Sequence, residues 1–145
     1  MSPAPLSRIA VIVLTAAVLA LYFRHRLFAT TVPLITIQVV AVLLMLWARL
    51  TFGWRSFHGI ATPTEGGLVT KGPYAYIRNP IYAASLLFMW AGVVAHAAPL
   101  PVGPAIIASA ALSIRIATEE RLVARRYPDY AAYAAKTRRL IPGVF

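Results

Sequence analysis

The chain has 145 residues, enough for one domain, and its composition excludes an ordinary soluble protein. Hydrophobic residues make up 60% and charged residues 12%, with a mean hydropathy of +0.73, whereas soluble domains are about 25% charged. The net charge of +10 would favour a nucleic-acid partner on a polar surface, but the basic residues stand between long apolar runs, as in membrane proteins. Cysteine is absent, which excludes disulfides, thiolate metal sites and cysteine nucleophiles.

Four apolar segments are candidate transmembrane helices, each near the roughly 20 residues that span a bilayer. They lie near residues 6–23, 30–48, 80–98 and 102–118. The second segment contains Pro33, Thr36 and Gln38, so at least one of its faces is expected to contact other helices rather than lipid. The predicted fold class is all-α: an integral membrane bundle of four transmembrane helices with a short C-terminal cytoplasmic helix, forming a single domain over residues 1–145.

The basic residues orient the predicted spans. Four spans place both termini on one side of the membrane. Arg8, the loop 49–79 and the tail 119–145 then share that side, whereas only Arg24 and Arg26 lie opposite. By the positive-inside rule, both termini, the loop and the tail are predicted to be cytoplasmic in a multi-pass membrane protein.

The tail is predicted to contain further helix. Residues 119–126 continue the fourth span beyond the bilayer, and Pro128, favoured in the first turn of a helix, begins a short helix that ends near residue 137. Tyr130 and Tyr133 share one face of this helix. By default such a helix lies on anionic lipid through its basic end. Alternatively it is a lid whose tyrosines close over a bound nucleoside or sulfonium.

A polar, aromatic stretch leads from the Gly- and Pro-rich loop 53–73 into the third span. Asn79 is a favourable N-cap and Pro80 a favourable first helical residue, so the free amides and positive dipole end of this helix would face the cytoplasm. Beside Lys71 and Arg78, such a helix start binds anions. The alternative, which these residues alone favour, is an ordinary helix start within an interfacial aromatic and basic belt.

Three charged residues mark the end of the fourth span. Arg115 stands four residues before Glu119, so the two side chains are expected to stack on one helical face. A charge inside the membrane normally faces protein or water. The pair is either purely structural, with Glu120 solvated, or the adjacent carboxylates bind ribose hydroxyls or a cation.

Together these stretches resemble the isoprenylcysteine carboxyl methyltransferase and phospholipid methyltransferase superfamily of integral membrane enzymes. The resemblance extends over about residues 66–142 and rests on five short elements in the family's order. They are Gly72-Pro73-Tyr74, Arg78-x-Pro80-x-Tyr82, Glu119-Glu120-x-Leu122, Tyr130-x-x-Tyr133 and Arg139-x-Ile141-Pro142.

The resemblance implies an S-adenosylmethionine-dependent methyltransferase with its cofactor between the last two spans, roofed by the C-terminal helix, and no metal. The cofactor-binding residues that it implies are Lys71, Gly72, Pro73, Tyr74, Arg78, Asn79, Tyr82, Glu119, Glu120, Tyr130 and Tyr133. The catalytic residues that it implies are Arg78, Arg139 and Glu120.

The implied acceptor is a lipid-like or prenylated amphiphile in the cytoplasmic interface, methylated on a carboxylate. Many family members have His where this chain has Asn79, so an imidazole-dependent step is not expected here. A carboxylate needs no general base, and Arg139 or Arg78 would position it. The alternatives are N-methylation of a phospholipid amine and a non-enzymatic lipid-binding scaffold. Small residues in the first span are compatible with an oligomer.

Overall fold

The computed structural model describes residues 3–53, 67–96 and 102–141, and most of these residues are helical. The described α-helices are α1 (Pro3–Phe23), α2 (Val32–Phe52), α3 (Pro80–Ala95), α4 (Val102–Arg126) and α5 (Tyr130–Lys136), with a 3₁₀ helix at Gly72–Ala75. Within the described residues, β-structure is limited to one isolated bridge between Ile77 and Arg138. The predicted all-helical fold is therefore confirmed.

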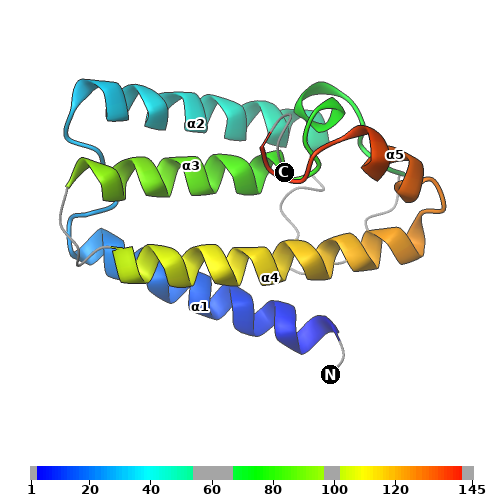
Figure 1. Cartoon of the computed structure of the whole chain (residues 1–145), viewed down its shortest axis with the longest axis horizontal. Coiled ribbons are helices and arrows are strands. Elements are labelled where there is room, and N and C mark those ends of the chain that lie inside the picture. The colour runs from blue at the N-terminus through cyan, green and yellow to red at the C-terminus, as the bar shows by residue number, and fades with distance from the viewer. Residues whose placement is uncertain (1–2, 54–66, 97–101, 142–145) are drawn as a thin grey trace.

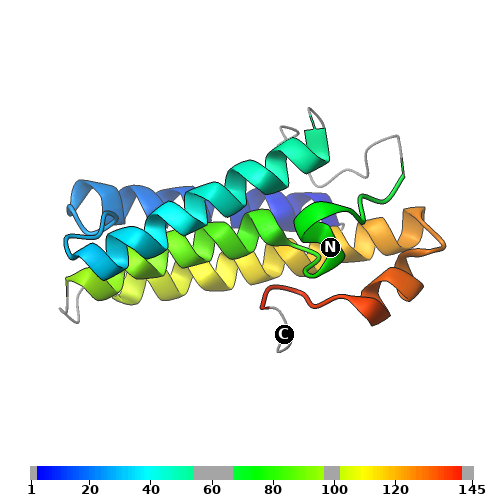
Figure 2. The same cartoon turned by 90° about the horizontal axis from the view of Figure 1, so that it is seen from above.

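The long helices lie side by side in the order α2, α3, α4, α1, and α5 lies beside the projecting end of α4 (Figure 1). α1 packs along α4 and α2 along α3, while α3 and α4 join the two pairs. When the molecule is turned, α3 and α4 run alongside each other, whereas α2 is inclined to them (Figure 2). The start of α3 and the end of α4 consequently meet at one end of the bundle.

Among the described residues, three helices are long and apolar enough to cross a bilayer: Leu6–Phe23, Val32–Phe52 and Val102–Arg126. The first has the bounds predicted from the sequence. α3 is apolar but has only 16 residues, a rise of about 24 Å against a hydrocarbon core of about 30 Å. Four transmembrane helices are therefore not confirmed, and the last two residues of the predicted span 80–98 lie outside the described part of the chain.

The other helix bounds differ from the predictions by about one turn. α2 continues to Phe52 and ends at Gly53, whose φ of 75° suits a helix terminus, so the first residues of the predicted loop 49–79 are helical. α4 continues through Arg126 as predicted. The short helix α5 begins at Tyr130, two residues after Pro128. Residues 54–66 of the loop lie outside the described residues.

A buried apolar cluster lies where α1, α3 and α4 meet. Its buried members are Ala17, Leu21, Met89, Val93, Ala105 and Ala108. Alanines on α1 and α4 allow the two helices to pack closely. On the outside of α2, large apolar side chains such as Leu43 and Leu46 are exposed, as expected for helices whose natural surroundings are lipid.

The connection between α1 and α2 is held against α3 by Gln38. The Gln38 side chain accepts a hydrogen bond from the amide of Ala29 (3.0 Å) and donates to the carbonyls of Leu27 (2.8 Å) and Phe88 (3.0 Å). This buried amide therefore contacts other elements, as its place in an apolar span predicted. The connection also requires Gly92, because a Cβ there would lie 2.0 Å from the carbonyl oxygen of Leu27.

Exchange of Gly92 for alanine is expected to destabilise the bundle by about 1.5 kcal/mol, because the backbone at Leu27 must move away from α3. Thermal unfolding in detergent measures the effect. Gly103→Ala is the matched control, since a Cβ at Gly103 meets nothing within 4 Å. Equal melting temperatures for the two variants would contradict this prediction.

Candidate active site

Polar side chains are joined by hydrogen bonds at one end of the bundle. This is the end where α3 begins and α4 projects (Figure 1). We call this set of side chains the polar cluster. It consists of Arg78, Asn79 and Tyr82 at the start of α3, Arg115, Glu119 and Glu120 on α4, and Arg139 after α5. Residues separated by 37 to 42 positions, such as Tyr82 and Glu119 or Arg78 and Glu120, are joined directly.

Glu120 connects the three parts of the polar cluster. Its Oε1 accepts hydrogen bonds from Arg78 Nε (3.2 Å) and from the side-chain amide of Asn79 (2.9 Å). Its Oε2 lies 3.0 Å from both Nε and Nη2 of Arg139. The side chain is only 13% exposed, so these charge-assisted bonds are weakly screened by solvent.

Asn79 occupies the N-cap position of α3, but its side chain does not cap the helix. The amide instead donates to Glu120 and to the carbonyl of Arg139 (3.2 Å). The predicted side-chain cap was therefore wrong, because a carboxylate is a stronger acceptor and outweighs the local capping preference. Pro80 is the first helical residue, as predicted. The anion held beside this helix start is the protein's own Glu120.

Glu119 belongs to a second set of contacts, which it forms with Arg115 and Tyr82 rather than with Arg78 and Arg139. It forms the predicted ion pair with Arg115, with Nη2 of Arg115 2.9 Å from Oε1 of Glu119. The hydroxyl of Tyr82 donates to the Glu119 carboxylate (2.7 Å) and accepts a hydrogen bond from Nε of Arg115 (2.7 Å). The charge of buried Arg115 is therefore compensated by protein rather than exposed to lipid.

Arg78 also fixes the C-terminal helix α5. Its Nη1 donates to the carbonyls of Ala134 (2.9 Å) and Thr137 (2.5 Å), at the end of α5, where helix carbonyls lack intrahelical partners. On the same helix, the hydroxyl of Tyr133 donates to the carbonyl of Tyr74 (2.8 Å). The helix predicted as a lid is thus attached over the start of α3.

Backbone pairing reinforces this attachment. The amide of Arg78 donates to the carbonyl of Arg138 (2.7 Å), and the amide of Arg138 donates to the carbonyl of Tyr76 (3.0 Å). The amide of Asn79 donates to the carbonyl of Arg139 (3.2 Å). Sequence reasoning missed this pairing, because two short segments with no alternating pattern give no strand signal.

Three residues predicted to bind the cofactor, Lys71, Gly72 and Pro73, lie outside the polar cluster. Lys71 is exposed, and its side chain makes no contact with the described residues of the cluster. Gly72, with a φ of 57°, packs on α2, where a Cβ would lie 2.8 Å from Thr51 Oγ1 and 3.2 Å from Trp47 Nε1. Gly72 therefore shapes a turn that positions the buried neighbours Pro73 and Tyr74.

The tyrosines of α5 form an aromatic surface beside the polar cluster. The rings of Tyr130 and Tyr133 lie edge to face with their centroids 6.1 Å apart, so they share a face as predicted. The hydroxyl of Tyr130 is buried, and it has no hydrogen-bond partner among the described residues. Burial, with a further contribution from Glu120, raises the pKa of Tyr130 to about 12. Both the burial of this group and its lack of a partner are unusual outside binding sites.

The sequence matches the phospholipid methyltransferase family over residues 26–130, which include the whole of α2, α3 and α4. The chain belongs to this family. Members of the phospholipid methyltransferase family are methyltransferases, and the superfamily resemblance found in the sequence motifs is confirmed. The matched region ends at residue 130, so Tyr133 and Arg139 lie beyond it.

This chain is similar to the cobalt-zinc-cadmium resistance protein CzcN of Cupriavidus metallidurans. The two are 32% identical over 136 residues, which cover 90% of this chain and 61% of CzcN. The chain therefore spans about three fifths of the length of that relative. No solved structure matches. In the part of the chain that the structure describes, no group of three or more His, Cys, Asp or Glu residues could hold a metal ion.

The raised pKa values of the α5 tyrosines predict how the stability of this phospholipid methyltransferase family member depends on pH. Burial raises the pKa of both Tyr130 and Tyr133 to about 12, above the value near 10 of an unfolded tyrosine. The neutral hydroxyls therefore stabilise the fold fully below about pH 10, and this contribution is lost as the pH rises from about 10 to 12. Thermal unfolding of the detergent-solubilised protein from pH 8 to pH 12 measures it.

The double variant Tyr130→Phe/Tyr133→Phe should lose less stability over that pH range, because it has no hydroxyl to ionise at these positions. Tyr76→Phe is the control, since the Tyr76 side chain is exposed. Identical pH profiles for the wild type and the double variant would contradict the prediction.

Proposed function

We propose that this chain is an S-adenosylmethionine-dependent methyltransferase that acts on a lipid-like or prenylated acceptor at the cytoplasmic membrane interface. Membership of a methyltransferase family supports the reaction class. The observation that carries the proposal is the convergence of the start of α3, the end of α4 and the segment after α5, with Asn79 Nδ2 2.9 Å from Glu120 Oε1. Such a convergence brings groups from three distant segments close enough to contact one bound cofactor.

The groups at the polar cluster fit S-adenosylmethionine, a nucleoside with a sulfonium, an ammonium and a carboxylate. Aromatic rings on α5 suit the purine or the sulfonium, carboxylates on α4 suit the ribose or the ammonium, and Arg78 suits the carboxylate. The buried hydroxyl of Tyr130, without a partner among the described residues, is a group that a bound molecule would satisfy. We assign the cofactor to residues Tyr74, Arg78, Asn79, Tyr82, Glu119, Glu120, Tyr130 and Tyr133, with Lys71, Gly72 and Pro73 at the edge.

Carboxyl methylation is the favoured reaction. When bound, S-adenosylmethionine would supply an electrophilic methyl group, so the protein has mainly to align an acceptor with it. Three guanidinium groups and two carboxylates leave the polar cluster with one excess positive charge, which attracts an anionic acceptor. Arg139 is 39% exposed, against 13% for Arg78 and 11% for Arg115. Arg139 is therefore the arginine that an acceptor arriving from the membrane would meet.

A phospholipid amine is the second candidate acceptor, and the family match favours it. An amine must lose a proton during methylation, so it needs a base within hydrogen-bond reach. In the polar cluster, Glu119 and Glu120 already take part in ion pairs with arginines. Amine methylation would therefore require one of these carboxylates to leave its arginine, whereas carboxyl methylation would not.

We also propose that α3 belongs to a fourth span and that both termini and the site are cytoplasmic. The absence of cysteine allows a direct test with single-cysteine variants. In intact cells, a membrane-impermeant maleimide should label His25→Cys and leave Arg125→Cys unlabelled until the cells are opened. Labelling of Arg125→Cys from outside would reverse the orientation, and labelling of both would contradict the topology.

Binding of S-adenosylhomocysteine, the product of the cofactor, tests the proposed activity. At a concentration of 100 times the dissociation constant, a ligand stabilises the folded protein by about 2.7 kcal/mol. The melting temperature in detergent should therefore rise with concentration and reach a clear shift of several degrees. No shift at millimolar concentration would favour a non-enzymatic lipid-binding scaffold.

The stability of the methylated product in mild base distinguishes a carboxylate acceptor from an amine acceptor. Membrane extract is incubated with the enzyme and cofactor carrying a labelled methyl group. A methyl ester releases labelled methanol in mild base, whereas an N-methyl group stays attached. Base-labile label is expected, and base-stable label in lipid headgroups would establish the amine acceptor instead.

A further inference from the structure

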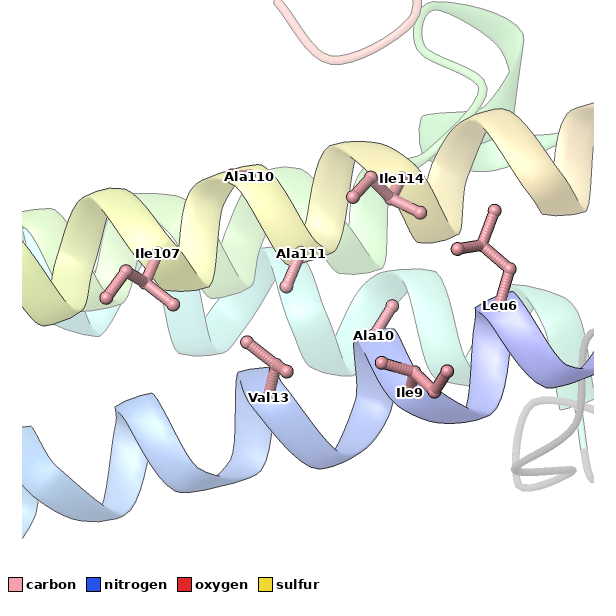
Figure 3. A pocket seen from close by; sticks show the side chains of 8 residues that line it. All are labelled: Leu6, Ile9, Ala10, Val13, Ile107, Ala110, Ala111 and Ile114. Atoms are coloured by element: carbon pink, nitrogen blue, oxygen red, sulfur yellow. The ribbon is translucent and has the colours of Figure 1, made fainter.

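An apolar groove runs between α1 and α4, away from the polar cluster. Figure 3 shows its lining, in which Leu6 and Ile114 mark one end and Val13 and Ile107 the other. All eight lining side chains are alanine, valine, leucine or isoleucine, and the groove has a volume of about 230 Å³. Because α1 and α3 lie on opposite sides of α4, the groove and the polar cluster do not share a helix face (Figure 1).

The occupant of this groove is expected to be apolar, because the groove lies within the membrane-spanning segments. Both of its helices are long and apolar enough to span a bilayer, and the groove lies within these segments. Hydrocarbon therefore surrounds it, and its carbon-only lining has no partner for a polar group. A single aliphatic chain lying between α1 and α4 satisfies these conditions.

Two arginines continue the groove side of α4 beyond the apolar segment. Arg121 and Arg125 follow Ile114 by seven and eleven residues, which places them within about 20° of Ile114 around the helix and about 10 and 16 Å further along it. Both are exposed, and neither forms an ion pair with a described residue. Thr118, between Ile114 and Arg121 on this side, is buried. On the groove side of α4, the positively charged residues therefore begin directly after the buried Thr118.

We propose that this surface binds an anionic phospholipid, with one acyl chain in the groove and the headgroup at Arg121 and Arg125. The lipid is distinct from the methyl acceptor, because the groove lies across α4 from the polar cluster. Arginines near a membrane surface attract anionic lipid headgroups. A second copy of the chain fits less well, since the same arginines would have to approach each other at a shared interface.

A bromine-labelled lipid tests the proposal in the cysteine-free chain. Ile106 is exposed beside the groove and does not line it, so Ile106→Cys can carry a fluorophore that bromine quenches. Phosphatidylglycerol or phosphatidylcholine with brominated chains is added to the protein in neutral detergent, without cofactor. Half-maximal quenching by phosphatidylglycerol is expected at about one tenth of the mole fraction that phosphatidylcholine requires.

Paired variants identify the groups responsible. Arg121→Gln/Arg125→Gln should abolish the preference for phosphatidylglycerol. Arg126→Gln/Lys136→Gln removes the same charge from exposed positions off the groove side and should preserve it. Circular dichroism checks that all variants are folded.

Three results would overturn the proposal. The first is equal quenching of the fluorophore by both lipids when Arg121 and Arg125 are both present. The second is a preference for phosphatidylglycerol that survives Arg121→Gln/Arg125→Gln. The third is absence of quenching together with a dimer in detergent. The last result would assign the groove to a second copy of the chain. None of these measurements depends on methyl transfer, so they stand apart from the proposed enzymatic function.

Discussion

Exchange of Glu120 for glutamine is expected to weaken binding of S-adenosylhomocysteine about 100-fold and to lower the free energy of unfolding by about 2 kcal/mol. Glutamine has nearly the same size and can still accept a hydrogen bond from Asn79. It cannot neutralise Arg78 and Arg139, which lie 3.2 Å and 3.0 Å from the carboxylate oxygens. Both guanidinium groups would then share a partly buried site without a counter-charge.

Calorimetric titration with S-adenosylhomocysteine and thermal unfolding in the same detergent measure these two effects. Asp129→Asn is the matched control, because it removes one negative charge from an exposed residue whose side chain does not cap α5. The control should bind the ligand as the wild type does. If Glu120→Gln and Asp129→Asn behaved alike, the polar cluster would not be the binding site.

Exchange of Arg78 for lysine is expected to release α5 from the bundle. Arginine reaches Glu120 through Nε and the carbonyls of Ala134 and Thr137 through Nη1 at the same time, whereas a lysine ammonium cannot span all three acceptors. Loss of two hydrogen bonds from a charged donor corresponds to about 3 kcal/mol, or more than about 100-fold in the population of the released state.

Hydrogen exchange should show this release as lost protection over residues 130–139, with little change in the long helices. Arg138→Lys is the control, because the Arg138 side chain is exposed and this residue contacts the segment before α3 through its backbone. Retained protection in Arg78→Lys would mean that backbone pairing alone holds α5. In that case Arg78 would be more available to a ligand than the structure indicates.

Local patterns predicted much of the fold. The span Leu6–Phe23 was predicted at its observed bounds because a continuous apolar run is a strong signal. The length of α3 was overestimated, because hydropathy shows how apolar a segment is and not where its helix stops. α3 ends at Ala95, before the predicted residue 98, with His96 at its C-cap.

Within the site, contacts inside one helix were predictable and contacts between helices were not. The Arg115–Glu119 pair follows from spacing of four residues on α4. The Asn79 side chain was predicted to cap α3 but binds Glu120, 41 positions away. Family motifs indicated that these residues belong to one site, yet not that Arg78 would fix α5 or that Tyr82 would lie between Arg115 and Glu119.

The pairing of the segment before α3 with the segment after α5 has a consequence for biosynthesis. These segments, joined by the contact of Asn79 with Arg139, are 60 residues apart. Arg139 follows the end of α4 by only 13 residues, so it is synthesised after every helix that it joins. The contacts of Arg139 with Asn79 and Glu120 therefore form only after α3, α4 and α5 have all been made.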